Sequence, residues 1–531
     1  REDCADMAIC EDDVKEEYIA RSRAVVVTGT HLSSDGVRAA SKKAIRLAKE
    51  HGARVAMDVD YRPVLWGLTT PELGEQRFVA NEAVTAELQT VIADCDLIVG
   101  TDEEIHILGG TTDTLAALKK VRELSPATIV LKRGELGCTV YDGEIGDHLD
   151  DGIFGRSFKI EVFNVLGAGD AFMAGFLRGW LRDRPLSECC TWANACGALV
   201  VSRHGCAPAI PSWTELQYFL ENGSDYLALR KDQKLEHVHW ATNRKHDYPS
   251  LKVLAIDHRM QFEKLVEELS VDSSQISKLK ELAIRAVDGL ANGDPGFGIL
   301  LDGRYGDDAL AMMGEYPYWI GRPIAASDVL PMKFEGTEAV AVELNKWPLT
   351  QTVKCLVNYR ATDPADYREC QERQLLRMAD ACRQTRHELM LEVVVQQNGS
   401  SEPGAAAEAM KRLYEIGIYP DWWKLGPLVT AQEFEQVSSV IDEFDPWCRG
   451  IVLLGLAAPL AELVENFEIA ARFPHIKGFV VGRSIWHAAA KAWLAGEIEN
   501  DEFVAQLQER FTLLSAAWDE AHSPKMRTGN E

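Results

Sequence analysis

The chain has 531 residues, of which 46% are hydrophobic and 26% are charged, which is enough to bury the cores of two or more domains. Its formal net charge of −26 argues against nucleic acids or anionic membranes as partners, because phosphate groups repel so acidic a surface. The 12 cysteines form no CxxC pair, no run reaches the roughly 20 apolar residues that span a bilayer, and the acidic start has no signal-peptide pattern. We expect a cytoplasmic homo-oligomer that acts on a small molecule.

Strand-like runs alternate with amphipathic helical stretches along the chain, which is typical of an α/β fold. The pattern lapses over residues 223–250, which are polar and indicate a connector between two domains. We place the first domain at 1–224, a linker at 225–248, the second domain at 249–520 and a tail at 521–531. In the first domain, the runs suited to buried parallel strands are residues 24–29, 54–60, 96–100 and 128–134.

Residues 164–172 read NVLGAGDAF and place Gly167, Ala168 and Gly169 between a strand-like and a helix-like run. Glycines at such a turn allow backbone N–H groups to converge, and the helix N-terminus adds roughly half a positive charge. This arrangement can bind the charge of a transferring phosphoryl group, and Asp170 is placed to accept a proton from an attacking hydroxyl. The alternative is a tight turn in which Asp170 only caps the helix.

The stretch NVLGAGDAFMAGFLRGW resembles the second signature of the ribokinase-type (PfkB) sugar kinases, Asp-Thr-x-Gly-Ala-Gly-Asp-x-Phe. It departs from that signature at Asn164 and Val165, where the family usually has Asp and Thr. The resemblance implies a ribokinase-like parallel-sheet sandwich, with ATP and Mg²⁺ as cofactors. In this family an N-terminal segment with paired glycines supplies most of the sugar pocket and its lid, and we expect this part of the kinase domain to be missing.

Three further stretches follow in the order of the same family. TDEE (101–104) resembles the Asn-x-x-Glu motif that organises Mg²⁺ through water, although an acidic helix N-terminus would look the same. LKRGELGC (131–138) resembles the strand and turn around the nucleotide phosphates, and residues 191–211 resemble the closing helix and loop near the adenosine. By this resemblance the metal-organising residue is Glu104, and the nucleotide-binding residues are Lys132, Gly134, Gly137, Asn194 and Gly205.

The stretch DVDYRPVLW (58–66) indicates the class of substrate. It resembles the Asp-x-Asn-x-Arg-x-x-Leu-Trp stretch of kinases for keto-deoxy sugar acids, with Asp60 in place of Asn. The planar fork of Arg62 suits a carboxylate or phosphate, so the resemblance makes Asp60 and Arg62 substrate-binding residues. Arg62 could instead be a surface residue paired with Asp58 or Asp60.

From residue 251 onward, apolar strand-like runs end in polar or glycine residues. A strand–helix series of about 270 residues fits a (β/α)8 barrel, in which the carboxyl ends of the strands share one mouth and the last two loops commonly bind phosphate. The residues expected at this mouth are Asp257, Asp302, Lys354, Glu392, Lys424, Gly455, Gly482, Arg483 and Ser484.

The two lysines of this series lie in apolar strand contexts. Burial lowers the pKa of a lysine and favours the neutral amine, which is the nucleophile that Schiff-base chemistry needs. The elements Ala-x-Asp-x-Arg, Val-Lys-x-Leu, Leu-Glu and Gly-Arg-x-x-Trp resemble, in this order, the class I tagatose-bisphosphate aldolase family. A structural salt-bridge network in a barrel without catalysis is the alternative.

The aldolase resemblance assigns a role to each residue of the barrel site. Lys424 would form the Schiff base, Lys354 would move protons or bind substrate, Glu392 would be a general acid/base, and Asp257 would be a polar partner. Arg483 and the N–H groups of Gly482 and Ser484 would hold a phosphate. Asp302 and Gly455 are expected to bind substrate.

Together the two resemblances imply two successive reactions. A keto-deoxy sugar acid is phosphorylated, and the carbon chain of the phosphorylated sugar acid is then split by retro-aldol cleavage. The alternative is a 2-keto-3-deoxygluconate-type kinase with a barrel that binds a phosphorylated sugar without cleaving it.

Overall fold

The computed structural model describes residues 5–70, 78–326, 329–336, 339–395, 402–426, 428–455 and 458–523. The chain divides into two compact units, Arg1–Asn243 and Arg244–Glu531, which are described separately. No helix in these described ranges combines the length and apolarity that crossing a membrane requires.

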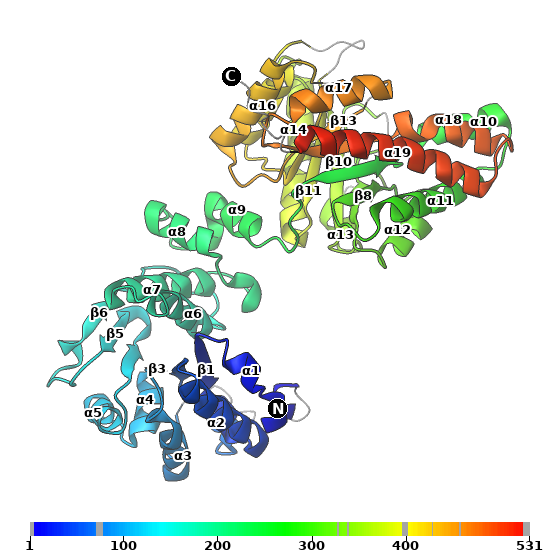
Figure 1. Cartoon of the computed structure of the whole chain (residues 1–531). Helices are drawn as coiled ribbons and strands as arrows, with labels where there is room; N and C mark the ends of the chain where they lie inside the picture. The colour runs from blue at the N-terminus through cyan, green and yellow to red at the C-terminus, as the bar shows by residue number, and fades with distance from the viewer. Residues whose placement is uncertain are drawn as a thin grey trace, which may run out of the picture. The chain divides into compact units, whose positions relative to one another are not determined.

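The first unit is built on a six-stranded mixed sheet (Figure 1). Strands β1 to β4 pair in parallel and confirm the four strands predicted from the apolar runs, whereas β5 and β6 add an antiparallel edge. The strands follow one another in the sheet in chain order: β1 (Ala24–Thr28), β2 (Arg54–Asp58), β3 (Leu97–Thr101), β4 (Thr128–Lys132), β5 (Cys138–Tyr141) and β6 (Ile153–Gly155).

Apolar side chains cover both faces of this sheet, as expected for buried parallel strands. On one face Met57 and Ile98 belong to a core that includes residues of the helices between β1 and β4. On the other face Ala56 and Val99 pack with Phe176 and other residues of the two helices that follow β6. The helices of the first face are α2 (Asp35–Glu50), α3 (Glu82–Ile92), α4 (Asp102–Gly109) and α5 (Thr114–Leu124), and those of the second are α6 (Ala168–Trp180) and α7 (Leu186–Val201).

The predicted linker, 225–248, contains a helix, α9 (Gln233–Thr242), which packs against α8 (Trp213–Asn222) in the first unit. Leu235 and Val238 are its buried apolar residues. With so few apolar positions the segment shows no helical period in the sequence, which explains why it reads as a connector. The unit boundary falls just after this helix, between Asn243 and Arg244.

The second unit is a closed barrel of eight parallel strands, which confirms the predicted (β/α)8 architecture (Figure 1). Its strands are β7 (Leu251–Ala255), β8 (Phe297–Leu300), β9 (Trp319–Pro323), β10 (Gln351–Asn358), β11 (Leu389–Val394), β12 (Trp422–Leu425), β13 (Gly450–Leu454) and β14 (Ile476–Val481). The helices around it are α10 (Met260–Leu269), α11 (Ser274–Ala291), α12 (Asp307–Met313), α13 (Val340–Leu344), α14 (Ala365–Thr385), α15 (Ala405–Glu415), α16 (Ala431–Phe444), α17 (Leu460–Ala470), α18 (Arg483–Leu494) and α19 (Asn500–His522).

Alternation along the strands determines which side chains point into the barrel. Met390 and Trp422 belong to the inner core, whereas Leu391 and Trp423 pack outward against the helices. Because the side-chain period of a strand is two, residues 392 and 424 point to the same side as Met390 and Trp422. The barrel therefore directs Glu392 and Lys424 toward its axis near the carboxyl ends of β11 and β12.

Candidate functional site

In the first unit, helix α6 begins at the glycine-rich turn. Gly167 is its N-cap residue, with a φ of 82°, and a Cβ added there would lie 2.5 Å from the Sγ of Cys206. Asp170 is exposed, its Oδ2 lies 3.9 Å from the Sγ of Cys206, and it is not the capping residue. Helix α6 therefore places its first N–H groups at this turn, and the anion hole stays a prediction. The role of Asp170 as a base stays a prediction.

A cavity of about 600 Å³ lies against the start of α6. Ala168 and Gly169 contribute to its wall, together with residues of β4, the following turn and α7. Its volume falls in the range of small-molecule sites. Of the predicted nucleotide-binding residues, those that line it are Lys132, Gly134, Gly137, Ala168, Gly169 and Asn194, whereas Gly167 and Gly205 border the turn without lining it.

Lys132 supplies a positive charge in this cavity. Its Nζ lies 3.2 Å from the Oδ1 of Asp58 and 3.4 Å from the Oε2 of Glu104, and a Cβ added at Gly169 would lie 3.7 Å from the same nitrogen. Burial lowers the Lys132 pKa, but Glu104 and Asp58 outweigh it and raise the pKa above its usual value. Burial also raises the pKa of Asp58 to about 6. The ammonium therefore stays charged beside the first turn of α6.

Glu104 has a second role in the local fold. Its Oε2 accepts a hydrogen bond of 2.7 Å from the Thr101 N–H, and its own N–H donates to the Thr101 Oγ1, which forms a capping box at the start of α4. In the part of the chain that the structure describes, no three His, Cys, Asp or Glu side chains are grouped to hold a metal ion. Proteins commonly bind Mg²⁺ through one or two carboxylates plus substrate phosphates, so Glu104 and Asp58 fit a metal that arrives with a nucleotide.

The predicted sugar-acid residues lie after β2. The Oγ1 of Thr30 donates a hydrogen bond of 2.7 Å to the Oδ2 of Asp60, and the Nε of Arg62 lies 3.1 Å from the Oδ1 of Asp60. Arg62 is thus paired with Asp60, one of the partners that the sequence left open. Neither residue lines the nucleotide-side cavity. Their contact with a substrate stays a prediction.

Two asparagines hold the walls of the cavity in place. The amide of Asn194 donates to the carbonyl of Cys190 at 3.0 Å and to that of Gly155 at 3.3 Å, which ties α7 to β6. The amide of Asn164 donates to the Gly205 carbonyl at 3.0 Å and fixes the loop beside the glycine turn. The sequence pattern shows Asn164 only as a departure from the kinase signature, so this positioning role was missed.

In the barrel, the polar residues of three adjacent strands come together. Strand register pairs Leu356 with Glu392 and Glu392 with Lys424, so side chains from β10, β11 and β12 lie side by side. The Nζ of Lys354 lies 2.7 Å from the Oε2 of Glu392, and the Nζ of Lys424 lies 3.2 Å from the same oxygen. Asp257, just after β7, completes the group with its Oδ2 3.2 Å from the Nζ of Lys354.

The two lysines have different pKa values because their partners differ. Burial lowers the pKa of Lys424, and Lys354 lowers it further, so the attraction of Glu392 does not restore it. For Lys354, burial is outweighed by Asp257 and Glu392, and its pKa is raised. Lys354 therefore remains a protonated ammonium group, whereas Lys424 loses its proton more readily. This is the electrostatic arrangement that makes a lysine nucleophilic.

A cavity of about 210 Å³ opens beside these residues at the carboxyl ends of the strands. The predicted residues that line it are Asp257, Lys354, Glu392, Lys424 and Arg483. Arg483 is the first residue of α18, and within the described part of the chain its guanidinium takes part in no ion pair. A helix N-terminus with a cation is suited to an anionic group, so Arg483 fits the predicted phosphate contact.

The other residues predicted in the last two loops border this region without lining the cavity. Gly455 follows β13, and a Cβ there would lie 3.1 Å from Val481. Gly482 follows β14 and packs against the backbone at the end of β7. The Ser484 hydroxyl donates a hydrogen bond of 2.7 Å to the carbonyl of Ala458. Phosphate contacts through their N–H groups stay predictions.

Asp302 does not lie in this cavity. It is fully buried and forms an ion pair with Lys280, while its Oδ2 accepts hydrogen bonds from the N–H groups of Arg304 at 3.0 Å and Tyr305 at 2.9 Å. Its carboxylate is therefore engaged by α11 and by its own turn. The structure gives Asp302 a role in the fold where the sequence predicted substrate contact.

We expect Asp302→Asn to lower the free energy of unfolding by about 1–3 kcal/mol, because Asn keeps the turn contacts but leaves Lys280 without its counter-charge. Burial lowers the Lys280 pKa, so this lysine can lose its proton, which limits the cost. Urea unfolding measures the change. Asp307→Asn, at a carboxylate whose side chain is 75% exposed, is the control and should change stability little. Unaltered stability with lost binding of a phosphorylated sugar would restore the original prediction.

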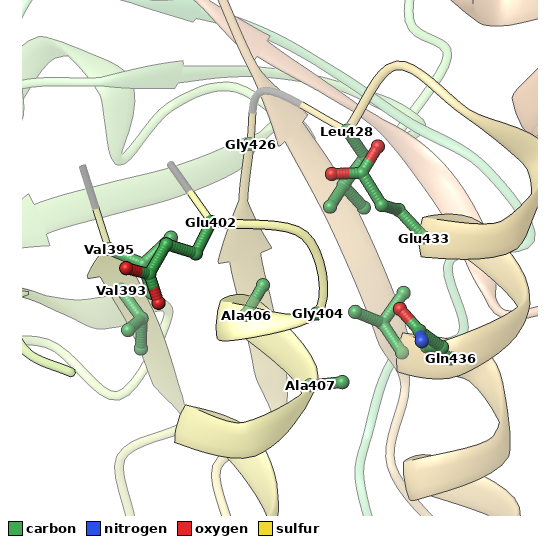
Figure 2. Close-up of a pocket in the computed structure, with 11 residues that line it drawn as sticks. Val393, Val395, Glu402, Gly404, Ala406, Ala407, Gly426, Leu428, Glu433 and Gln436 are labelled. Carbon is green, nitrogen blue, oxygen red and sulfur yellow. The ribbon is translucent and has the colours of Figure 1, made fainter. Parts of the chain in front are cut away.

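A second, much smaller cavity lies outside the strand wall (Figure 2). It is bordered by Val393 and Val395 of the β11 region, by the start of α15, and by Glu433 and Gln436 of α16. Its volume of about 10 Å³ holds one water molecule at most. It is too small for a substrate.

Sequence reasoning missed His258, which also lines the Lys424 cavity. It follows Asp257 directly, within the Ala-x-Asp-x-Arg element that resembles the aldolase family. The signal was an imidazole at a strand end beside a predicted active-site carboxylate.

Two different family models match the two parts of the chain. Residues 2–213 match the family model described as "pfkB family carbohydrate kinase". Residues 215–522, more than half of the chain, match the family described as "Uncharacterized protein conserved in bacteria (DUF2090)". The chain belongs to this DUF2090 family.

Curated relatives of the first unit are named 5-dehydro-2-deoxygluconokinase. The one from Geobacillus kaustophilus is 28% identical over 236 residues, which is 44% of this chain and 65% of the relative. The one from Halalkalibacterium halodurans is 32% identical over 225 residues, which is 42% of this chain and 62% of the relative. The chain thus spans less than two thirds of the length of these relatives. Among solved structures, a putative ribokinase II of E. coli in complex with ATP and Mg²⁺ is similar, with 22% identity, a TM-score of 0.34, and coverage of 40% of this chain and 63% of that chain.

Proposed function

We propose that the chain is a bifunctional enzyme of a sugar-acid pathway, myo-inositol catabolism. Its first unit phosphorylates 5-dehydro-2-deoxy-D-gluconate with ATP to give the 6-phosphate. Its barrel then cleaves a carbon–carbon bond of this phosphorylated sugar acid, which gives dihydroxyacetone phosphate and malonate semialdehyde. The observation that carries the proposal is Lys424, whose pKa is lowered by burial and by Lys354 at the wall of a polar cavity.

The kinase half of the proposal rests on the cavity at the start of α6. The helix N-terminus and Lys132 place positive charge where nucleotide phosphates would lie, and Asp170 is exposed at the first turn. The relatives named 5-dehydro-2-deoxygluconokinase supply the substrate class. ATP with Mg²⁺ supplies the phosphoryl group, and the hydroxyl proton of the sugar acid passes to Asp170.

The barrel reaction follows from amine chemistry at Lys424. Its neutral amine attacks the C5 carbonyl of the phosphorylated sugar acid, water leaves, and an iminium forms. Loss of the C3 hydroxyl proton breaks the C3–C4 bond, which gives malonate semialdehyde and an enamine. Protonation of the enamine at C4 and hydrolysis then release dihydroxyacetone phosphate. No external oxidant or reductant is needed, and Arg483 holds the phosphate throughout.

One observation favours a different function. Lys354, Asp257 and Glu392 form a closed ion-pair network that would also stabilise a barrel without catalysis. In this alternative, the barrel binds a phosphorylated sugar, and the kinase acts on 2-keto-3-deoxygluconate or a related acid. Mixing the chain with the 6-phosphate and measuring both three-carbon products separates the two, because the alternative yields neither product.

We expect Asp170→Asn to lower the rate of phosphoryl transfer by about 10²–10⁴-fold, because Asn cannot accept the hydroxyl proton. Nucleotide affinity should remain unchanged, since the cavity walls are the same. The rate is measured by release of ADP with 5-dehydro-2-deoxygluconate in a chain to which the expected N-terminal kinase segment has been restored, and the affinity by titration with ATP. Asp225→Asn, at an exposed residue that does not line the cavity, is the control. An Asp170→Asn variant as fast as the unsubstituted chain would remove Asp170 from the mechanism.

A further inference from the structure

The carboxylates of the barrel site are poorly placed to accept a proton. Cleavage requires a group that takes the hydroxyl proton, and the aldolase resemblance gives this role to Glu392. However, the Oε2 of Glu392 is shared by Lys354 at 2.7 Å and Lys424 at 3.2 Å. Burial raises its pKa, but the two lysines outweigh burial and lower it. An oxygen that is already held by two ammonium groups is not free to take a proton from the substrate.

Asp257 is disfavoured for the same reason. It is buried, and its Oδ2 lies 3.2 Å from the Nζ of Lys354. Although burial opposes ionisation, Lys354 and the other nearby cations lower the pKa of Asp257. Among the carboxylates that line the described cavity, neither is therefore suited to hold a proton during catalysis.

We propose that His258 is the proton acceptor of the barrel, and that its neutral imidazole takes the proton of the substrate hydroxyl as the carbon–carbon bond breaks. This proposal rests on the proposed Schiff base at Lys424. His258 lines the same cavity as Lys424 and Arg483. Its Nδ1 is buried and, within the described residues, has no hydrogen-bond partner; the Oδ1 of Asp257 lies 3.8 Å away.

The charges around His258 keep it neutral before substrate binds. Burial lowers its pKa to about 4, Asp257 opposes this shift, and Lys424, Lys354 and Arg483 add to it. A phosphate bound at Arg483 would cancel part of this positive potential. The imidazole should therefore become a stronger base when the substrate is in place.

The surrounding residues also fix the orientation of the ring. The Trp486 ring meets the His258 ring edge-to-face, with 5.1 Å between centroids, and its Nε1 donates to the carbonyl of Ala255 at 3.1 Å. Lys280 donates to the His258 carbonyl at 3.2 Å. A Cβ at Gly482 would lie 2.7 Å from the His258 Cε1, so only glycine leaves room for the ring in this position. A catalytic side chain must be held in this way to act with precise geometry.

The proposed step balances in protons and electrons. The C3 hydroxyl proton moves to a ring nitrogen of His258, and its bonding electrons form the C3 carbonyl. The electrons of the C3–C4 bond form the enamine and neutralise the iminium on Lys424. The enamine then takes a proton from water at C4, and water hydrolyses the resulting iminium to free the Lys424 amine. The imidazolium returns its proton to water, and neutral His258 is restored. Nothing is oxidised or reduced.

The test is His258→Gln, with three readouts on the whole chain. Borohydride reduction with dihydroxyacetone phosphate reports the Schiff base, exchange of the carbon-bound hydrogen of dihydroxyacetone phosphate with deuterium oxide reports the enamine, and release of malonate semialdehyde reports cleavage. We expect cleavage to fall by about 10²–10⁴-fold while adduct and exchange persist. His487→Gln is the matched control, because His487 is exposed and contacts the same Trp486.

Each other outcome overturns a stated part of the proposal. Unchanged cleavage in His258→Gln removes His258 from the reaction. If His258→Gln loses both deuterium exchange and cleavage, His258 acts in proton transfer at the carbon atom and not at the hydroxyl. If the borohydride adduct is lost as well, His258 only maintains the structure of the site. If the unsubstituted chain forms no adduct and cleaves nothing, the aldolase proposal itself fails, and this is seen before any variant is made.

Discussion

Lys424→Met is expected to abolish the covalent adduct that borohydride traps with dihydroxyacetone phosphate, and to reduce cleavage by roughly 10⁴–10⁶-fold, as loss of a covalent nucleophile does. Methionine has a similar length but no amine. The fold should survive, because Glu392 keeps its ion pair with Lys354 at 2.7 Å. Mass spectrometry of the reduced, digested chain measures the adduct and identifies the modified lysine.

The matched control for this variant is Lys252→Met. Lys252 is also a buried lysine on a barrel strand, but it pairs with Asp519 of α19 at 2.8 Å and does not line the cavity. Its variant should form as much adduct as the unsubstituted chain. An adduct on Lys354, or one that persists in Lys424→Met, would contradict the assignment of the nucleophile.

Five of the residues predicted at the barrel mouth line one cavity, because strand periodicity determines side-chain direction. Glu392 and Lys424 stand two residues after Met390 and Trp422, and the inward side of those strands fixes where the charged groups point. Helix α6 was predictable for a similar reason, since a glycine turn between strand-like and helix-like runs leaves few other geometries.

Other features depend on contacts that a linear pattern does not contain. Asp302 follows a strand in the same way as the residues that line the cavity, but its side chain forms an ion pair with Lys280 of α11. The position of the His258 ring depends on Trp486 and Gly482, which lie more than 200 residues later in the chain. The edge strands β5 and β6 are only 4 and 3 residues long, too short for periodicity to identify.

Lys354→Met should destabilise the barrel more than any other single change at this site. Lys354 is the shared partner of Asp257 at 3.2 Å and of Glu392 at 2.7 Å. Its removal leaves the carboxylate of Asp257 buried without this partner, whereas Glu392 still has Lys424. Breaking a buried pair in this way costs about 3–5 kcal/mol, so we expect the free energy of unfolding at neutral pH to fall by that amount.

The pH dependence of this loss identifies its cause. Lys354 helps to lower the pKa of both Asp257 and Glu392, so its contribution is present above the pKa of the unfolded carboxylates and disappears as pH falls. The difference between Lys354→Met and the unsubstituted chain should therefore shrink between pH 7 and about pH 4, where Asp257 of the variant takes up a proton. Urea unfolding across this range measures it, with Lys424→Met as the control that leaves the Asp257–Lys354 pair intact. A loss that stays constant with pH would show that packing around the lysine stem, and not its charge, holds the strands together.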